Sequence, residues 1–388
     1  MSVSCSKWKF VRLGELAEFR NGVNYNRDSF GAGVKVVGVK DFQNYSKPRY
    51  ETLEQINPDG VVTSKSILKD GDIIFVRSNG NPELIGRSLL IDNPPEEVTH
   101  SAFTIRLRFH SPDIYPKFFA YFFRTTAIRK GLTAYGGGTN ISNLNQDILN
   151  DLKIPLPDLP TQRRIAGILS AYDDLIENNL RRIRILEEMA QSLYREWFVH
   201  FRFPGHESVP LTDSPLGPIP QGWRVGQLQD IAVLQRGFDL PKGKRMEGEV
   251  PIYAASGITG YHVEAKVKAP GIVTGRSGTI GEVMYVQEDF WPLNTALWVK
   301  QLPESEPLYA YYYLRSVDLK GFNSGAAVPT LNRNDVHGLA ALVPSKAVQT
   351  KFQVIAERLH LQLRTLQSKN ETLRQTRDLL LPKLLSGA

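Results

Sequence analysis

Apolar residues recur at alternating steps of four and three along the stretch from Thr161 to about His200. The series is Ile165, Leu169, Tyr172, Ile176, Asn179, Ile183, Leu186, Ala190, Leu193 and Trp197. This spacing is typical of the narrow seam of a coiled coil. A single helix of about 50 Å, at 1.5 Å per residue, does not bury such a seam alone. The pattern therefore predicts a second helix elsewhere in the chain.

A matching series lies near the C-terminal end of the sequence. Its members are Phe352, Ala356, Leu359, Leu363, Leu366, Asn370, Leu373, Arg377, Leu380 and Leu384. If the helices run antiparallel with Asn179 facing Asn370, every alanine of one seam faces a leucine of the other, which fills the core evenly. A buried asparagine pair fixes the register, because a slip would place an amide against hydrocarbon. The seams predict a two-helix rod whose layers run from Ile165 with Leu384 to Trp197 with Phe352; the alternative is two unrelated surface helices.

The remaining sequence contains one domain-sized block twice. The stretch from Trp8 to Ala17 resembles the stretch from Trp223 to Ala232, and both blocks continue with short runs rich in β-branched residues, bounded by Gly, Pro and Asn. Such runs predict strands and tight turns. We therefore expect an α+β protein with two globular α/β domains separated by two long antiparallel coiled-coil helices, related by a pseudo-twofold internal repeat.

The domain boundaries follow from these patterns and from the prolines. Residues 203–221 contain five prolines, which disfavour a helix or a central strand. The expected order is a first globular domain at 1–156, a central helix at 157–202, a linker at 203–221, a second globular domain at 222–343 and a C-terminal helix at 344–388. A proline closes each domain, and a glutamine five residues later, Gln162 or Gln349, opens each helix.

A basic loop follows the same predicted strand in both blocks. The loops are Arg77-Ser78-Asn79 and Arg276-Ser277-Gly278, and each precedes an Ile-Gly pair. An arginine at a strand end, followed by small polar residues, brings a guanidinium and backbone amides close to a phosphate or a base edge. The alternative is a hairpin turn whose arginine pairs with a carboxylate. Recurrence in both blocks favours DNA contact.

Arg77 and Arg276 are the leading candidates for contact with guanine or phosphate. The weaker candidates for DNA contact are Arg20, Asn21, Lys40, Asn140, Asn143, Arg236, Asn332 and Arg333. The aromatic runs at 118–123 and 309–313 predict core helices rather than base-stacking surfaces. The target bases depend on loop geometry and DNA shape, so they do not follow from the sequence.

No catalytic constellation is present in the sequence. Asn93-Pro94-Pro95-Glu96 resembles the Asn/Asp-Pro-Pro-aromatic element of amino-methyltransferases, but Glu96 replaces the aromatic residue. The seven histidines lack metal-ligand spacing, so we expect neither catalytic residues nor a metal site.

Charge and composition add the expected setting. The net charge of +7 is consistent with a polyanionic partner. A single cysteine, Cys5, indicates a reducing compartment. No apolar run approaches the 18 residues of a membrane span, so the expectation is a cytoplasmic protein without membrane contact.

Together, the tryptophan-initiated repeat, the Gly71-Asp72-Ile73-Ile74 run before Arg77, the proline-then-glutamine helix starts and the heptad helices resemble the specificity subunit of type I restriction-modification systems. The resemblance covers nearly the whole chain. It implies a non-catalytic reader of double-stranded DNA, in which each recognition domain reads half of a bipartite target and the helical rod sets the unspecified gap.

The resemblance also implies partners. These are two adenine methyltransferase subunits and, in the full complex, restriction subunits, with S-adenosylmethionine, ATP and Mg expected in the partners and no cofactor bound by this chain. The exposed helix residues Arg181, Arg182, Arg184, Glu187 and Glu188 are a candidate docking surface for the methyltransferase. The alternatives are a recognition subunit or a coiled-coil scaffold for a different DNA-modifying enzyme.

Overall fold

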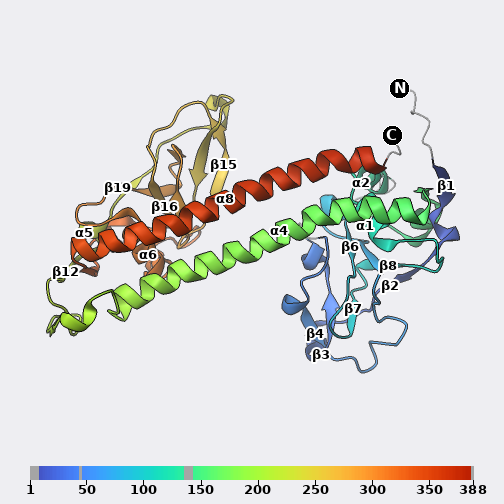
Figure 1. Cartoon of the computed structure of the whole chain (residues 1–388), viewed down its shortest axis with the longest axis horizontal. Helices are drawn as coiled ribbons and strands as arrows, with labels where there is room; N and C mark the ends of the chain where they lie inside the picture. The colour runs from blue at the N-terminus through green and yellow to red at the C-terminus, as the bar shows by residue number, and fades with distance from the viewer. Residues whose placement is uncertain (1–7, 43–45, 135–142, 386–388) are drawn as a thin grey trace. The chain divides into compact units, whose positions relative to one another are not determined.

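The chain forms two compact units, each built around part of both long helices. The computed structural model describes residues 8–42, 46–134 and 143–385. The first unit comprises Met1–Asn178 and Lys369–Ala388, and the second comprises Asn179–Ser368. The long helices are α4 (Leu159–Tyr194) and α8 (Lys346–Leu385), labelled in Figure 1. A short π-helix, η6 (Arg195–Val199), continues α4.

Outside the long helices, the described residues of the first unit form three small sheets, three short helices and 3-10 turns. The four-stranded sheet has the order β2 (Ala17–Asn21), β8 (Thr104–Phe109), β5 (Ile73–Val76), β6 (Ser88–Leu90). A three-stranded sheet has the order β4 (Glu54–Ile56), β3 (Phe30–Val37), β7 (Val98–His100), and β1 (Lys9–Arg12) pairs with β9 (Lys153–Leu156). The helices are α1 (Pro116–Phe123), α2 (Thr126–Ala134) and α3 (Gln146–Asp151), with 3-10 turns η1 (Leu13–Glu15), η2 (Arg27–Ser29), η3 (Val39–Phe42), η4 (Tyr50–Thr52) and η5 (Pro82–Leu84).

The second unit contains the same sheets in the same order. Its four-stranded sheet has the order β13 (Val233–Arg236), β19 (Ala296–Gln301), β16 (Gly271–Gly275), β17 (Val283–Val286). Its three-stranded sheet has the order β15 (Gly257–His262), β14 (Val250–Ala254), β18 (Trp291–Pro292), and β12 (Arg224–Gln227) pairs with β20 (Ala340–Val343). The helices are α5 (Leu228–Ile231), α6 (Pro307–Ser316) and α7 (Arg333–His337), with 3-10 turns η7 (His206–Ser208), η8 (Lys242–Lys244) and η9 (Leu319–Phe322).

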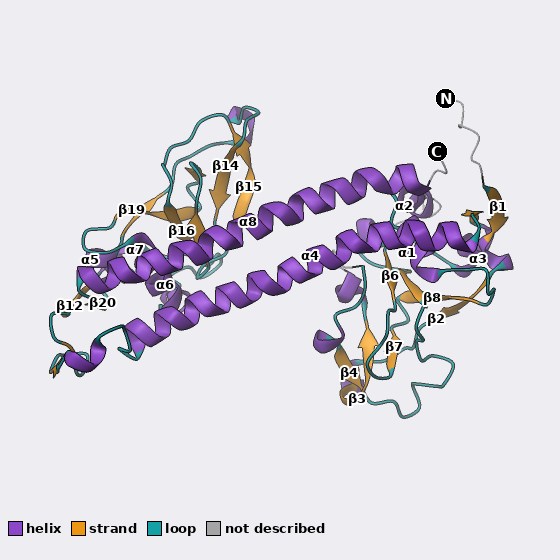
Figure 2. Ribbon diagram, viewed as in Figure 1, coloured by secondary structure: helices purple, strands orange, loops and turns teal. Residues whose placement is uncertain are grey.

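This shared topology confirms the internal repeat. In each three-stranded sheet, the middle strand has one antiparallel and one parallel neighbour, β4 and β7 around β3, and β15 and β18 around β14. Figure 2 shows strands and short helices in both units, so both are mixed α/β as the sequence predicts.

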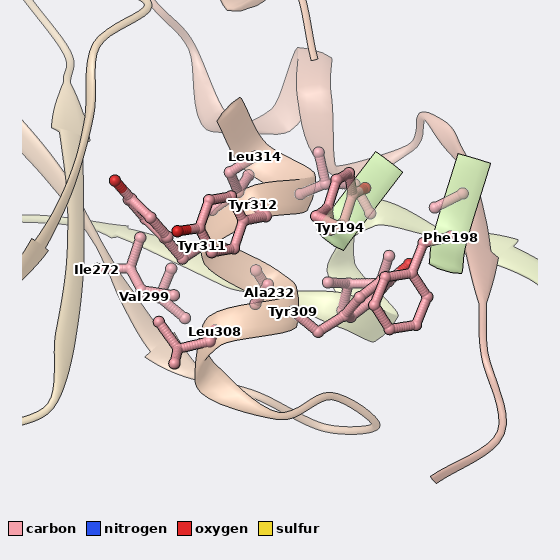
Figure 3. Close-up of a cluster of buried hydrophobic side chains, with 14 of the residues drawn as sticks. Tyr194, Phe198, Ala232, Ile272, Val299, Leu308, Tyr309, Tyr311, Tyr312 and Leu314 are labelled. Atoms are coloured by element: carbon pink, nitrogen blue, oxygen red, sulfur yellow. The ribbon is translucent and has the colours of Figure 1, made fainter. Parts of the chain in front are cut away.

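The aromatic runs form core helices, as predicted. In the second unit, α6 buries Tyr309 and Tyr312, and the ring centroids of Phe198 and Tyr309 lie 4.7 Å apart (Figure 3). In the first unit, α1 buries Phe118 and Phe123 in the equivalent way. These rings supply much of the apolar area that holds each unit on its helices.

Within each unit, α4 and α8 pack antiparallel along the predicted seams. In the first unit, Ile165 and Leu169 of α4 share a hydrophobic cluster with Leu384 of α8. In the second unit, Ile183 and Leu186 cluster with Leu363 and Leu366, in the middle of α8. The end of the seam has the predicted register, because the rings of Trp197 and Phe352 are in contact with centroids 6.0 Å apart.

The two seam asparagines are buried. Asn179 is 8% exposed and Asn370 is 2% exposed. In the first unit, the Asn370 side-chain amide lies 3.5 Å from the carbonyl oxygen of Ile176, which accepts its hydrogen bond. The facing of Asn370 with Asn179 itself stays a prediction. Arg377, which the predicted register places opposite Tyr172, forms an ion pair with the next residue of α4, Asp173.

Residues 203–221, expected to be a linker, pack on the second unit. The segment forms a two-stranded sheet of β10 (Leu211–Thr212) and β11 (Ile219–Pro220). Phe203 and Ile219 are buried in the main core cluster, and the Phe203 ring stacks on Trp223 with centroids 5.4 Å apart. The prolines exclude a helix, but the segment is folded on the core of the second unit and is not an extended linker.

Candidate functional site

The basic loop of the first unit is held by backbone hydrogen bonds on both sides. The amide of Arg77 donates to the carbonyl of Phe103 at 2.8 Å, and the amide of Leu144 donates to the carbonyl of Arg77 at 2.9 Å. Ser78 forms a β-bridge with Asn143. The loop after β5 is therefore fixed between the turn before β8 and the segment before α3.

The loop of the second unit has the same geometry. The amide of Arg276 donates to the carbonyl of Thr295 at 2.9 Å, and the amide of Leu331 donates to the carbonyl of Arg276 at 2.8 Å. Ser277 forms a β-bridge with Thr330. Two loops with the same backbone hydrogen bonds and the same β-bridge, one in each unit, indicate a repeated functional element.

Neither leading arginine has a carboxylate partner within residues 8–42, 46–134 and 143–385. Arg276 donates through Nη1 to the carbonyl oxygen of Asn294 at 3.0 Å, and no ion pair is formed by Arg77 or Arg276 among these residues. The hairpin alternative, with each arginine neutralised by a carboxylate, therefore does not hold. A half-buried guanidinium without a counter-charge favours an anionic or base-edge ligand.

A cleft of about 490 Å³ lies beside the first loop. Its lining includes the rings of Tyr25 and Phe103, the amine of Lys40 and the small polar side chains of Ser78, Asn79 and Ser101. The structure thus brings three sequence candidates together here. Lys40 is paired with Glu54 at the edge of the cleft. The Asn79 side chain accepts a hydrogen bond from the amide of Asn81 at 2.8 Å, which orients it.

The other candidates of the first unit lie outside this cleft lining. Arg20 and Asn21 are on β2, where Arg20 is opposite Arg106 in the register with β8. The Asn21 side-chain oxygen accepts a hydrogen bond from Gln146 at 3.1 Å. Asn143 is exposed beside Ser78, and Asn140 lies outside the described residues.

In the second unit, a polar network connects two of the candidates. Arg236 pairs with Asp239 at 3.4 Å, and the Asn294 side-chain amide also donates to Asp239. The carbonyl of the same Asn294 accepts from Arg276, so Arg236 and Arg276 are joined through Asp239 and Asn294. Asp239 thus fixes the geometry around Arg276 and lowers the local positive charge at Arg236.

Asn332 has a structural role that its sequence context signals. Its side chain accepts from the amide of Asn334 at 3.1 Å and donates to Asp335 at 3.2 Å, which caps α7. The Asn-x-x-Asp spacing is a helix N-terminus signal. Arg333, the first residue of α7, is exposed.

Sequence reasoning missed the residues around the turn before β8. Phe103 is 62% exposed although it is a large apolar residue. Its neighbour His100 is fully buried, and its Nδ1 lies 2.9 Å from the Thr104 hydroxyl. Burial, helped by the charge of Arg106, lowers the pKa of His100 to about 3, so this histidine is neutral near pH 7. Exposure of a single aromatic residue has no signal in an isolated sequence.

Groups of three or more His, Cys, Asp or Glu side chains placed to hold a metal ion are absent from the part of the chain that the structure describes. In the same residues, no helix combines the length and the apolar character that crossing a membrane requires.

Comparison with known proteins decides the family. The family described as "Type I restriction modification DNA specificity domain" matches residues 5–188 and 220–375, so each match includes one recognition domain and much of one long helix. The chain belongs to this family. It is a DNA sequence specificity subunit of a type I restriction-modification system, and its role is non-catalytic.

Known relatives match along nearly the whole chain. The specificity subunit of the type I restriction enzyme MjaIX from Methanocaldococcus jannaschii is 24% identical, over 98% of this chain and 93% of the relative. The HindI specificity subunit from Haemophilus influenzae is 23% identical, over 98% of this chain and 99% of the relative. The crystal structure of a type I S subunit from M. genitalium has the same fold, with a TM-score of 0.63 and 18% identity over 99% of this chain and 98% of that one.

Proposed function

We propose that each unit of this specificity subunit reads one half of a bipartite target in double-stranded DNA. The observation that carries this proposal is the repeated loop, in which Arg77 and Arg276 have the same backbone contacts and no carboxylate partner among the described residues. An arginine fork matches the two acceptors of guanine in the major groove, or a phosphate. Two such loops in one chain supply two independent readers.

The proposal includes the roles of the long helices. Because α4 and α8 each contribute to both units, they are the elements that set the unspecified gap between the two half-targets. The same helices present exposed apolar residues beside their charged ones: Ile168 and Leu175 in the first unit, and Ile185 and Met189 in the second. Exposed apolar side chains at helical spacing are suited to receive helices of a partner.

The proposed partners are two adenine methyltransferase subunits, with restriction subunits in the full complex. S-adenosylmethionine, ATP and Mg would be held by those partners, and this chain would bind none of them. The family match supports a type I complex over a scaffold for an unrelated DNA-modifying enzyme. We place the complex in the cytoplasm, where its DNA substrate and a reducing environment for Cys5 are both present.

A change in helix length tests the proposal. Seven residues that continue the heptad pattern are inserted into α4 beside Ile176 and seven into α8 beside Leu373, so that the seam keeps its phase. At 1.5 Å per residue, this lengthens the paired helices by about 10 Å, or about three base pairs of DNA. We expect methylation at the same two half-targets separated by a longer gap. An assembled complex that keeps the original gap would refute the role of the helices.

A further inference from the structure

A tight turn precedes β8 in the first unit and β19 in the second. Backbone hydrogen bonds join this turn to the arginine loop. In the first unit, the amide of Thr104 donates to the carbonyl of Ser101 at 2.9 Å, which places Ala102 and Phe103 at the two corners of a tight turn. The carbonyl of Phe103 accepts the amide of Arg77. The Phe103 backbone and the arginine loop therefore move as one piece.

The second unit has the equivalent turn with different side chains. The amide of Ala296 donates to the carbonyl of Leu293 at 2.9 Å, so Asn294 and Thr295 occupy the corners. The carbonyl of Thr295 accepts the amide of Arg276, as that of Phe103 accepts the amide of Arg77. The shared turn carries an exposed phenylalanine in the first unit and a threonine with a buried hydroxyl in the second, so the two units offer different surfaces at this corner.

Phe103, at 62% exposure, is the most exposed phenylalanine among the described residues. It shares the cleft with Lys40, Ser78 and Asn79. An apolar ring exposed to water is unfavourable in free energy, and a ligand that covers the ring gains this free energy on binding. The neighbouring Arg77 has no carboxylate partner among the described residues, so an anionic duplex is attracted to the same edge.

We propose that Phe103 reads a thymine in one half-target by packing its ring on the C5-methyl group in the major groove. This methyl is the one apolar group that the bases present there, and an apolar side chain is its natural partner. Arg77, whose backbone amide donates directly to the carbonyl of Phe103, contacts the adjacent base pair or phosphate. The inference rests on the proposed function, because it needs the first unit to dock on DNA through this edge.

Replacement of thymine by uracil tests the contact, since it removes only the methyl group. Complexes of the full chain with its methyltransferase are titrated with target duplexes in which each thymine of either strand, in both half-targets, is replaced singly by uracil. For the wild-type complex, one position should lose about four-fold in affinity, the factor for one buried methyl group. Phe103→Ala should weaken binding to the all-thymine duplex and be insensitive to uracil at that position.

A matched variant and two other outcomes make the test decisive. Phe10→Ala removes another exposed phenylalanine of the first unit, on β1 and outside the lining of the cleft, and should keep the wild-type response to uracil. If Phe103→Ala lowers the affinity by the same factor on both duplexes, the variant still distinguishes thymine from uracil as the wild type does. That result would overturn the methyl contact and indicate a wedge between base steps. A wild-type complex that does not prefer its target over an unrelated duplex would instead refute the proposed function.

Discussion

Gln162 and Gln349 make the same set of hydrogen bonds in the two units. Both are fully buried near the start of a long helix. Each side-chain oxygen accepts a backbone amide, from Tyr115 at 2.7 Å or Glu306 at 2.9 Å. Each side-chain amide donates to two carbonyl oxygens, those of Asp113 and Pro157 in the first unit and of Glu304 and Pro344 in the second. One glutamine thus ties each recognition domain to the helix that carries it.

Gln162→Ala should therefore destabilise the first unit. The change leaves an amide and two carbonyl groups without their partner in a buried place, at a cost of about 3 kcal/mol. Denaturant unfolding measures the loss as a lower midpoint. Gln375→Ala, at an exposed position of α8, should change stability by less than about 0.5 kcal/mol. Equal midpoints for the two variants would show that the glutamine does not anchor the helix.

A second anchor joins α1, α4 and α8 in the first unit. Asp173 accepts a hydrogen bond from the Tyr121 hydroxyl at 2.7 Å and pairs with Arg377 at 2.5 Å and with Arg124 at 3.5 Å. Asp173→Ala leaves two cations and a buried hydroxyl without this carboxylate, so a loss of about 2 to 3 kcal/mol is expected. Asp174→Ala, the exposed neighbour, is the control in the same unfolding assay. A wild-type midpoint for Asp173→Ala would contradict this role.

The equivalent position of the second unit is His360, which makes stability depend on pH. Its Nε2 lies 2.9 Å from the Tyr312 hydroxyl, and its ring packs on Tyr285 and Tyr311. Burial, with a smaller effect of the charge of Arg315, lowers its pKa from 6.5 to about 4. Between these values the unfolded chain binds a proton that the folded chain does not, so stability is full above pH 6.5 and decreases as the pH falls to about 4.

His360→Gln should reduce this pH dependence. The slope of unfolding free energy between pH 6.5 and 4 should decrease by up to about 1.4 kcal/mol per pH unit, the value for one proton. Denaturant titrations at several pH values measure it. His200→Gln serves as the control for loss of an exposed histidine. If the His360 variant has the wild-type slope, protonation of this residue does not contribute to acid unfolding.

Arg276→Ala should disrupt recognition of one half-target and leave assembly of the complex intact. Loss of a bidentate base contact costs about 1 to 3 kcal/mol, or roughly ten- to a hundred-fold in affinity. The affinity of the assembled complex for its target and the methylated motif are the measurements. Arg202→Ala, an exposed arginine paired with Glu196, is the control. Unchanged motif and unchanged affinity would remove Arg276 from the list of DNA contacts.

Much of the fold could be predicted because it follows from repeated patterns. The heptad spacing predicted the contact of Trp197 with Phe352, and the repeat predicted the matching sheets. The spacing did not reveal that Asp173 pairs with Arg377, because periodicity identifies the face of a helix and not the partner that a polar side chain selects. The packing of Phe203 on Trp223 was missed because the prolines of residues 203–221 indicate only that the segment is not a helix or a central strand. They do not indicate what the segment packs against.

The candidate site was harder to predict than the fold. The Arg77 and Arg276 loops recur in the sequence, and their shared geometry follows from that recurrence. The ion pair of Arg236 with Asp239 depends on how the chain turns after β13, which residue types alone do not specify. The exposure of Phe103 depends on the tight turn that precedes β8, so it emerges only from the structure.

The most direct test of the central claim is methylation sequencing of cell DNA. Cells that carry this chain together with its methyltransferase are compared with cells that carry the methyltransferase alone. We predict a new bipartite N6-methyladenine motif that appears only when this chain is present, with two specified halves separated by a fixed gap. A folded and assembled complex that adds no motif would contradict the claim that this chain determines the DNA sequence.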